Sequence, residues 1–257
     1  MRLNKYIAAA SELSRRAADV AIAEGRVTIN GKIASIGSPA ELTDVISLDG
    51  VKLVFRQTHT TIILHKPVGY VCSRDGQGSL TVYDLLPPEL HLLNPVGRLD
   101  KDSSGLLLMT DDGDLANKLT HPRYAKTKVY EITLDKPLQP LHQQIISDHG
   151  ILLEDGLSRF SIQKLESRVM RHESREEDTP LRGNKNVRQK PDTISTHDSY
   201  LLPHDSHAYE VRMQEGRNRQ IRRTFAALGY TVTTLHRTHF GPHTLDDLQA
   251  GQWKKVA

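Results

Sequence analysis

Residues Gly97 to Thr110, GRLDKDSSGLLLMT, form a polar turn that runs directly into an apolar segment. The apolar run from Leu106 to Met109 lies between two turn signals, which is typical of a buried strand. We therefore predict that Asp100 lies on a loop held by a core strand, where a rigid scaffold often presents a reacting group. The alternative is that Asp100 or Asp102 only ties the turn through hydrogen bonds to the backbone.

This segment resembles a known catalytic signature. Gly97-Arg98-Leu99-Asp100, followed by Ser104-Gly105-Leu106-Leu107, is similar to the signature of the pseudouridine synthases, in the branch that includes RsuA and RluB. Three further family patterns follow the expected order: Lys66-Pro67-Val68-Gly69, Lys128-Val129-Tyr130 and Gly216-Arg217-Asn218-Arg219-Gln220-Ile221-Arg222-Arg223. The resemblance covers the chain apart from about 166–207, and it implies an enzyme that isomerises uridine in RNA.

Composition limits the other classes of protein. The chain has 257 residues, enough for one large domain or two smaller ones, and its net charge of +3 permits an anionic partner without requiring one. A single cysteine, Cys72, excludes an internal disulfide and fits a reducing cytoplasm. No run of about 18 apolar residues predicts a membrane span, and residues 1–10 lack the apolar core of a signal peptide.

Residues 1–57 read as a small separate domain. Leu3, Ile7 and Ala10 share one helical face, Ser14 is a good N-cap for a second helix, and Asn30-Gly31 predicts a tight hairpin. This order resembles the S4-like RNA-binding domain, also called the alpha-L motif. By that resemblance a set of basic residues would hold RNA phosphates, although charge alone equally fits a solvated face. The set comprises Arg2, Lys5, Arg15, Arg16, Arg26 and Lys32.

Residues 60–257 are expected to form the catalytic domain. The patterns predict strands at 61–65, 106–109, 126–134, 209–213, 231–232 and 235–237, a hairpin over 151–162, a closing element over 240–253, and helices at 81–86, 114–119, 140–148 and 220–229. The segment at about 166–207 is polar and poor in aliphatic residues, so we expect a flexible insertion. The fold class is α+β, and the resemblance implies a mixed, mainly antiparallel sheet with the active cleft across it.

The resemblance also assigns the chemistry. Asp100 would be the ionised carboxylate that acts as nucleophile or base, and Arg222 would pair with it and keep it charged. Tyr130 would stack on the uracil, although an isolated strand tyrosine is more often an ordinary half-buried aromatic. Further RNA contacts are assigned to Arg98 and Lys101, which flank Asp100, and to Arg217, Arg219 and Arg223, for which surface charge is the alternative.

No cofactor or metal is expected. The uracil never leaves the site, so the isomerisation needs no external acceptor and no redox cofactor. His236 with His239, or His204 with His207, has ligand-like spacing, but the paired cysteines or His-Glu-x-x-His of a metal site are missing. The expected partner is ribosomal RNA or a ribosome-assembly intermediate, bound by a cytoplasmic monomer with no membrane association.

The Phe240-Gly241-Pro242 ending and the Gly216–Arg219 turn favour the large-subunit RNA as substrate, with the small-subunit RNA as the alternative. A non-catalytic RNA-binding or ribosome-assembly protein on the same fold is the alternative from another class. A metal-dependent nuclease is a distant third, because no carboxylate cluster supports it.

Overall fold

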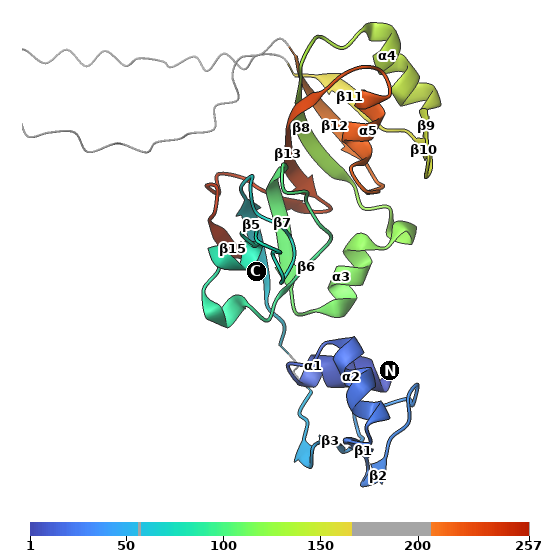
Figure 1. Ribbon diagram of the computed structural model, residues 1–257, viewed down its shortest axis with the longest axis vertical. Helices are drawn as coiled ribbons and strands as arrows, with labels where there is room; N and C mark the ends of the chain where they lie inside the picture. The colour runs from blue at the N-terminus through green and yellow to red at the C-terminus, as the bar shows by residue number, and fades with distance from the viewer. Residues whose placement is uncertain (56–57, 166–206, 257) are drawn as a thin grey trace, which may run out of the picture.

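The computed structural model describes residues 1–55, 58–165 and 207–256, which form a small N-terminal domain and a larger domain built on one long sheet (Figure 1). The expected insertion therefore lies outside the described residues, apart from His207. In the described residues no helix is both long and apolar enough to cross a bilayer.

Two helices and a four-stranded sheet make the N-terminal domain. The elements are α1 (Leu3–Ala10), α2 (Arg15–Ala23), β1 (Val27–Ile29), β2 (Lys32–Ile33), β3 (Ile46–Leu48) and β4 (Val51–Lys52), with sheet order β2-β1-β3-β4. As predicted, Ser14 caps α2 by accepting a hydrogen bond from the backbone N–H of Ala17 at 3.1 Å. Asn30 and Gly31 both have positive φ angles, 50° and 80°, as the tight hairpin requires.

The larger domain is organised around a mixed sheet. Its strands are β5 (Thr61–Lys66), β6 (Asn94–Pro95), β7 (Ser104–Thr110), β8 (Lys128–Leu134), β11 (Ser161–Lys164), β12 (Ala208–Met213), β13 (Val232–Phe240), β14 (His243–Thr244) and β15 (Trp253–Lys255). The main path runs β11-β12-β8-β13-β7-β5-β15, and β6 and β14 pair with β7 and β13. The β13–β7 pairing is parallel and the other pairings are antiparallel, which confirms the α+β class with a mixed, mainly antiparallel sheet.

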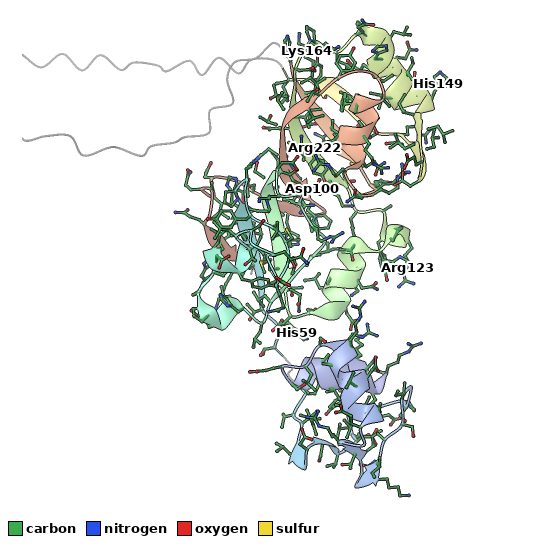
Figure 2. The ribbon with its side chains drawn as sticks, viewed as in Figure 1. His59, Asp100, Arg123, His149, Lys164 and Arg222 are labelled. Atoms are coloured by element: carbon green, nitrogen blue, oxygen red, sulfur yellow. The ribbon has the colours of Figure 1, made fainter. Side chains whose placement is uncertain are left out.

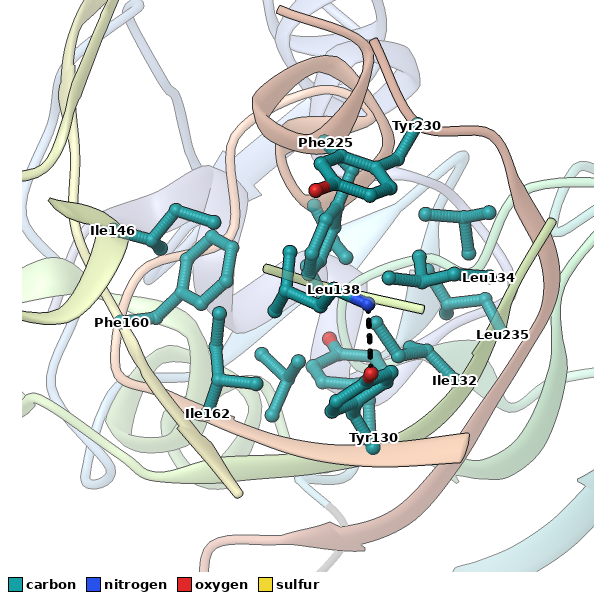
Figure 3. Packing of buried hydrophobic residues seen from close by; sticks show 14 of the residues in the cluster. Tyr130, Ile132, Leu134, Leu138, Ile146, Phe160, Ile162, Phe225, Tyr230 and Leu235 are labelled. Atoms are coloured by element: carbon teal, nitrogen blue, oxygen red, sulfur yellow. Dashed lines mark hydrogen bonds between the residues drawn. The ribbon is translucent and has the colours of Figure 1, made fainter. Parts of the chain in front are cut away.

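Short helices and one separate hairpin complete this domain. They are η1 (Val82–Leu85), η2 (Pro88–Leu90), α3 (Gly113–Thr120), η3 (Pro122–Tyr124), α4 (Pro140–Gln144), the π-helical η4 (Ile145–His149), β9 (Ile151–Leu153), β10 (Gly156–Ser158) and α5 (Gln220–Ala226). Figure 3 shows the core beneath α5, where Phe225 and Tyr230 pack with Leu138 and with strand residues such as Ile132. This packing fixes α5 over the sheet.

Some local expectations need correction. The hairpin expected over 151–162 ends at Ser158, and Ser161–Lys164 instead joins the main sheet beside β12. The two short strands expected at 231–232 and 235–237 are one continuous strand, β13, whose register shifts twice against β8. The helix expected at 140–148 is α-helical only to Gln144 and continues as a π-helical turn.

The parallel contact between β7 and β13 depends on Gly105. Its φ is +109°, and a Cβ placed there would lie 2.3 Å from the carbonyl oxygen of Arg237. Only glycine fits both that backbone conformation and that close approach. The loop that precedes Gly105 contains Asp100, so this approach sets where the carboxylate can lie.

Candidate active site

A cleft of about 770 Å³ crosses the middle of the larger domain. One wall is the loop from Gly97 to Ser103, and the opposite wall is the segment Met213–Arg222, which leads into α5. The floor includes Tyr130 from β8 and Arg237 from β13. Figure 2 places Asp100 and Arg222 close together here, so the structure brings these predicted residues into one site.

Buried contacts hold the Asp100 loop from below. The Lys66 side chain has no exposed surface, and its Nζ donates to the carbonyl oxygens of Ser103 at 2.6 Å and Pro67 at 3.0 Å. Burial lowers the pKa of Lys66 to about 8, opposed by nearby Cys72 and then by the carboxylates of Asp100 and Asp102. The N–H of Gly69 adds a hydrogen bond to the carbonyl oxygen of Lys101 at 2.8 Å. The loop therefore has defined partners on the backbone as well as at its side chains.

Two guanidinium groups of the opposite wall meet this loop. Arg219 binds both carboxylate oxygens of Asp102 at 3.0 and 2.8 Å, and its Nη1 lies 3.6 Å from Oδ2 of Asp100. The hydrogen bond from Arg219 lowers the pKa of Asp102, so that neighbour of Asp100 is held as an anion. The Asp100 side chain is 35% exposed, which leaves the carboxylate accessible from the cleft.

Arg222 differs from the expectation. It was predicted to pair with Asp100, but its Nε lies 3.4 Å from Oδ2 of Asp102 and its Nη2 donates to the carbonyl oxygen of Asp102 at 2.8 Å. Its Nη1 donates to the carbonyl oxygen of Val232 at 2.5 Å. Arg222 therefore ties the loop to β13, and the guanidinium within ion-pair distance of Asp100 belongs to Arg219.

Tyr130 lies on the floor of the cleft. It is 7% exposed, belongs to the core cluster beneath α5, and pairs across the sheet with Val211 on one side and Arg237 on the other. A tyrosine in this position presents a ring to the cleft while its backbone stays fixed in the middle of the sheet. The geometry fits a stacking surface for a planar base.

Two of the residues predicted to bind RNA also have partners within the protein. Arg223 holds both oxygens of Asp155 at 3.1 and 2.6 Å, and Arg217 adds contacts to Asp155 at 3.0 Å and to the carbonyl oxygen of Leu157 at 2.9 Å. These bonds tether the β9–β10 hairpin to α5 and to the segment before it. Arg98, Arg217 and Arg219 line the cleft, and Lys101 is exposed beside it with its Nζ 3.0 Å from the Ser79 hydroxyl.

The N-terminal basic residues divide in the same way. Arg26 pairs with Asp49 at 2.6 Å, and Lys5 pairs with Asp114 at the start of α3 at 2.6 Å, which links the two domains. Four others are exposed, and in the described residues their side chains have no hydrogen bond or ion pair: Arg2, Arg15, Arg16 and Lys32. These four are free to meet a phosphate backbone.

The described histidines with ligand-like spacing, His236 and His239, have separate partners. His236 contacts the Ser104 hydroxyl at 2.8 Å through Nδ1, whereas His239 contacts Thr238. His204 lies outside the described residues. Within the portion of the chain that the structure describes, no three His, Cys, Asp or Glu side chains form a metal-binding group.

Sequence reasoning missed Lys66 and Arg237 as parts of the site. Lys66 was noted only as part of a family pattern, and Arg237 only as part of a strand. The available signal was a basic residue at an inward position of a strand, between Leu235 and Phe240. Such a residue is seldom fully buried without a partner.

Comparisons with known proteins identify the family to which this chain belongs. The sequence profile of the RNA pseudouridylate synthases matches residues 60–227. The chain belongs to this family. The S4 domain profile matches residues 1–46, so the pseudouridylate synthase region follows an RNA-binding module of the expected type.

Three relatives and one solved structure span nearly all of this family member. The ribosomal small subunit pseudouridine synthase A of Pasteurella multocida is 32% identical over 100% of the chain and 96% of that protein. The large subunit pseudouridine synthases B of Bacillus subtilis and Pseudomonas aeruginosa are 33% and 32% identical over 99% of the chain, which spans 91% and 59% of their lengths. A crystal structure of a pseudouridylate synthase superposes with a TM-score of 0.62 at 27% identity, covering 100% of this chain and 96% of that one.

Proposed function

We propose that this protein isomerises uridine in ribosomal RNA to pseudouridine, with Asp100 as the catalytic carboxylate. The N1–C1′ glycosidic bond breaks, the uracil turns in place, and a C5–C1′ bond forms. The proton on C5 is released and N1 gains one, so atoms balance without a second substrate. The observation that supports this most strongly is a partly exposed carboxylate beside Arg219, in a cleft that Tyr130 also lines, in a member of this family.

Each residue of the site has a separate role in this proposal. Asp100 acts on the sugar or the base as nucleophile or base, and Tyr130 stacks on the uracil. Arg219 keeps a positive charge beside Asp100, while Arg222 holds the loop through Asp102. The target nucleotide must leave its helix to reach this depth, which costs a few kcal/mol when it begins paired. Basic residues around the cleft and on the N-terminal domain supply binding energy to offset that cost.

We propose that the substrate is large-subunit ribosomal RNA, either free or in an assembly intermediate. We also propose that the protein works as a cytoplasmic monomer. The support is the Phe240-Gly241-Pro242 ending, while the relatives include enzymes named for either subunit. The test is tritium release from small- and large-subunit transcripts labelled at uracil C5, with pseudouridine mapped in RNA from a deletion strain. We expect release from the large-subunit transcript. Release from only the small-subunit transcript would reverse the assignment, and release from neither would refute the function.

A further inference from the structure

Two cations on the floor of the cleft have no carboxylate partner among the described residues. Lys128 and Arg237 lie on neighbouring strands and both approach the Phe240 ring, with Nζ 5.3 Å and Cζ 4.9 Å from the ring centroid. Lys128 is directly opposite Phe240 across the sheet, and Arg237 is directly opposite Tyr130. All four residues line the same cleft.

The local bonds of these cations are few. In the part of the chain that the structure describes, Lys128 Nζ donates to the carbonyl oxygens of Gln214 at 3.1 Å and Lys126 at 3.4 Å and to no other acceptor. Arg237 is 2% exposed, its Nε donates to the carbonyl oxygen of Leu106 at 2.8 Å, and its Nη2 is buried with no hydrogen-bond partner. Within the described ranges neither side chain lies within 4 Å of a carboxylate oxygen. Desolvation, together with the charge of Arg237, lowers the pKa of Lys128.

Other arginines beside the cleft, unlike Lys128 and Arg237, have carboxylate partners. Arg219 and Arg222 pair with Asp102, and Arg217 pairs with Asp155 and Glu215. The two carboxylates that line the cleft, Asp100 and Glu215, are therefore already within reach of other guanidinium groups. Two like charges kept together in a partly desolvated place cost free energy, which a bound anion would offset.

We propose that Lys128 and Arg237 form a phosphate subsite that binds a phosphodiester group adjoining the target uridine. This inference rests on the proposed function. Lys128 is two residues from Tyr130 on the same strand face, roughly 7 Å away, a span that the ribose between base and phosphate can bridge. With the base on Tyr130 and the sugar beside Asp100, the phosphate would lie beside the Lys128 ammonium and the Arg237 guanidinium. A guanidinium and an ammonium together suit a phosphate, which accepts charge-assisted hydrogen bonds on several oxygens.

The test uses small probes that do not depend on the target site in RNA. Uridine, uridine 3′-monophosphate and uridine 5′-monophosphate are titrated into the full-length wild-type protein and into Lys128→Met, with binding followed by NMR. One monophosphate should bind the wild type at least about tenfold more tightly than uridine, and that advantage should fall to about twofold or less in Lys128→Met. The monophosphate that binds more tightly than uridine shows whether the subsite contacts the 3′ or the 5′ side of the nucleotide.

Lys255→Met is the matched control, because Lys255 is exposed on β15 at the far edge of the sheet and should keep the full advantage. Arg237→Gln is a second variant, with its melting temperature measured to establish folding. If neither monophosphate binds the wild type more tightly than uridine, or if the advantage survives in Lys128→Met, the subsite is refuted.

Salt dependence on RNA gives an independent measurement. Loss of one phosphate contact should reduce the slope of log K against log salt by roughly 0.7 to 0.9 for Lys128→Met, with no change for Lys255→Met. An unchanged slope would contradict the subsite. Wild-type turnover with no phosphate preference would refute only this inference. Absence of tritium release from every ribosomal transcript would refute the proposed function instead.

Discussion

Arg222 pairs with Asp102, not with Asp100. Its Nε lies 3.4 Å from Oδ2 of Asp102, and its Nη2 donates to the carbonyl oxygen of the same residue at 2.8 Å. A second bond, from Nη1 to the carbonyl oxygen of Val232, fixes the guanidinium to β13. We therefore propose that Arg222 acts on Asp100 through the loop, as a positioning residue, with Asp102 as the link between them.

Arg222→Ala should therefore lower turnover and also destabilise the fold. It leaves two backbone carbonyl oxygens without their donor, so we expect a loss of about 1–3 kcal/mol in the free energy of unfolding. Because Arg222 and Asp102 act together, the effects of Arg222→Ala and Asp102→Asn on kcat should be non-additive, with a coupling of about 0.5–3 kcal/mol. A double-mutant cycle on tritium release measures this coupling, and fully additive losses would contradict the link.

Gly105→Ala should destabilise the larger domain strongly. The new methyl group would lie 2.3 Å from the carbonyl oxygen of Arg237, and the residue would keep a φ of +109° that alanine rarely adopts. Strain of this kind costs about 2–4 kcal/mol, measurable by denaturant unfolding. Gly113→Ala is the control: it begins α3 with nothing within 4 Å, and should change stability by about 1 kcal/mol or less. Equal stability of the two variants would show that β7 and β13 are not held this closely.

His236 should make the protein less stable in acid. Burial, then the neighbouring His65, lowers the pKa of His236 from 6.5 to about 4. Between these two values the unfolded chain binds a proton that the folded protein does not, so stability falls as the pH drops from 6.5 towards 4 and is unaffected by this group above 6.5.

A comparison of wild type with His236→Gln tests the direction of this pH dependence of stability. In the variant, the free energy of unfolding should fall less steeply over that window, by roughly 1 kcal/mol per pH unit. His149→Gln, at an exposed site, controls for the loss of an imidazole. A wild-type slope that His236→Gln leaves unchanged would mean that this histidine does not titrate as its burial requires.

Local features of the chain were predictable from the sequence. The Ser14 cap, the Asn30-Gly31 hairpin and the strand after Asp100 each depend on neighbouring residues, and each is present. The Asp49-Gly50 turn between β3 and β4 carries a comparable signal, with positive φ at both residues, but was not recognised.

Long-range partners were not predictable in the same way. The pairing of β13 with β7, the bond of Lys66 to Ser103, and the choice of Asp102 over Asp100 by Arg222 join residues far apart in the chain. Periodicity gives the face on which a side chain lies but not its partner on another element. The same limit applies to Arg217 and Arg223, because the sequence does not show whether a basic side chain contacts Asp155, RNA or both.

The most direct test of the central claim compares two neighbouring carboxylates in one assay. Tritium release from ribosomal RNA labelled at uracil C5 is measured for wild type, Asp100→Asn and Asp102→Asn, with melting temperature and RNA affinity checked for each. Asp100→Asn should lose at least about a thousandfold in kcat while folding and binding RNA normally, and Asp102→Asn should retain measurable turnover. Near-normal release by Asp100→Asn, or loss confined to Asp102→Asn, would contradict the assignment of Asp100 as the catalytic residue.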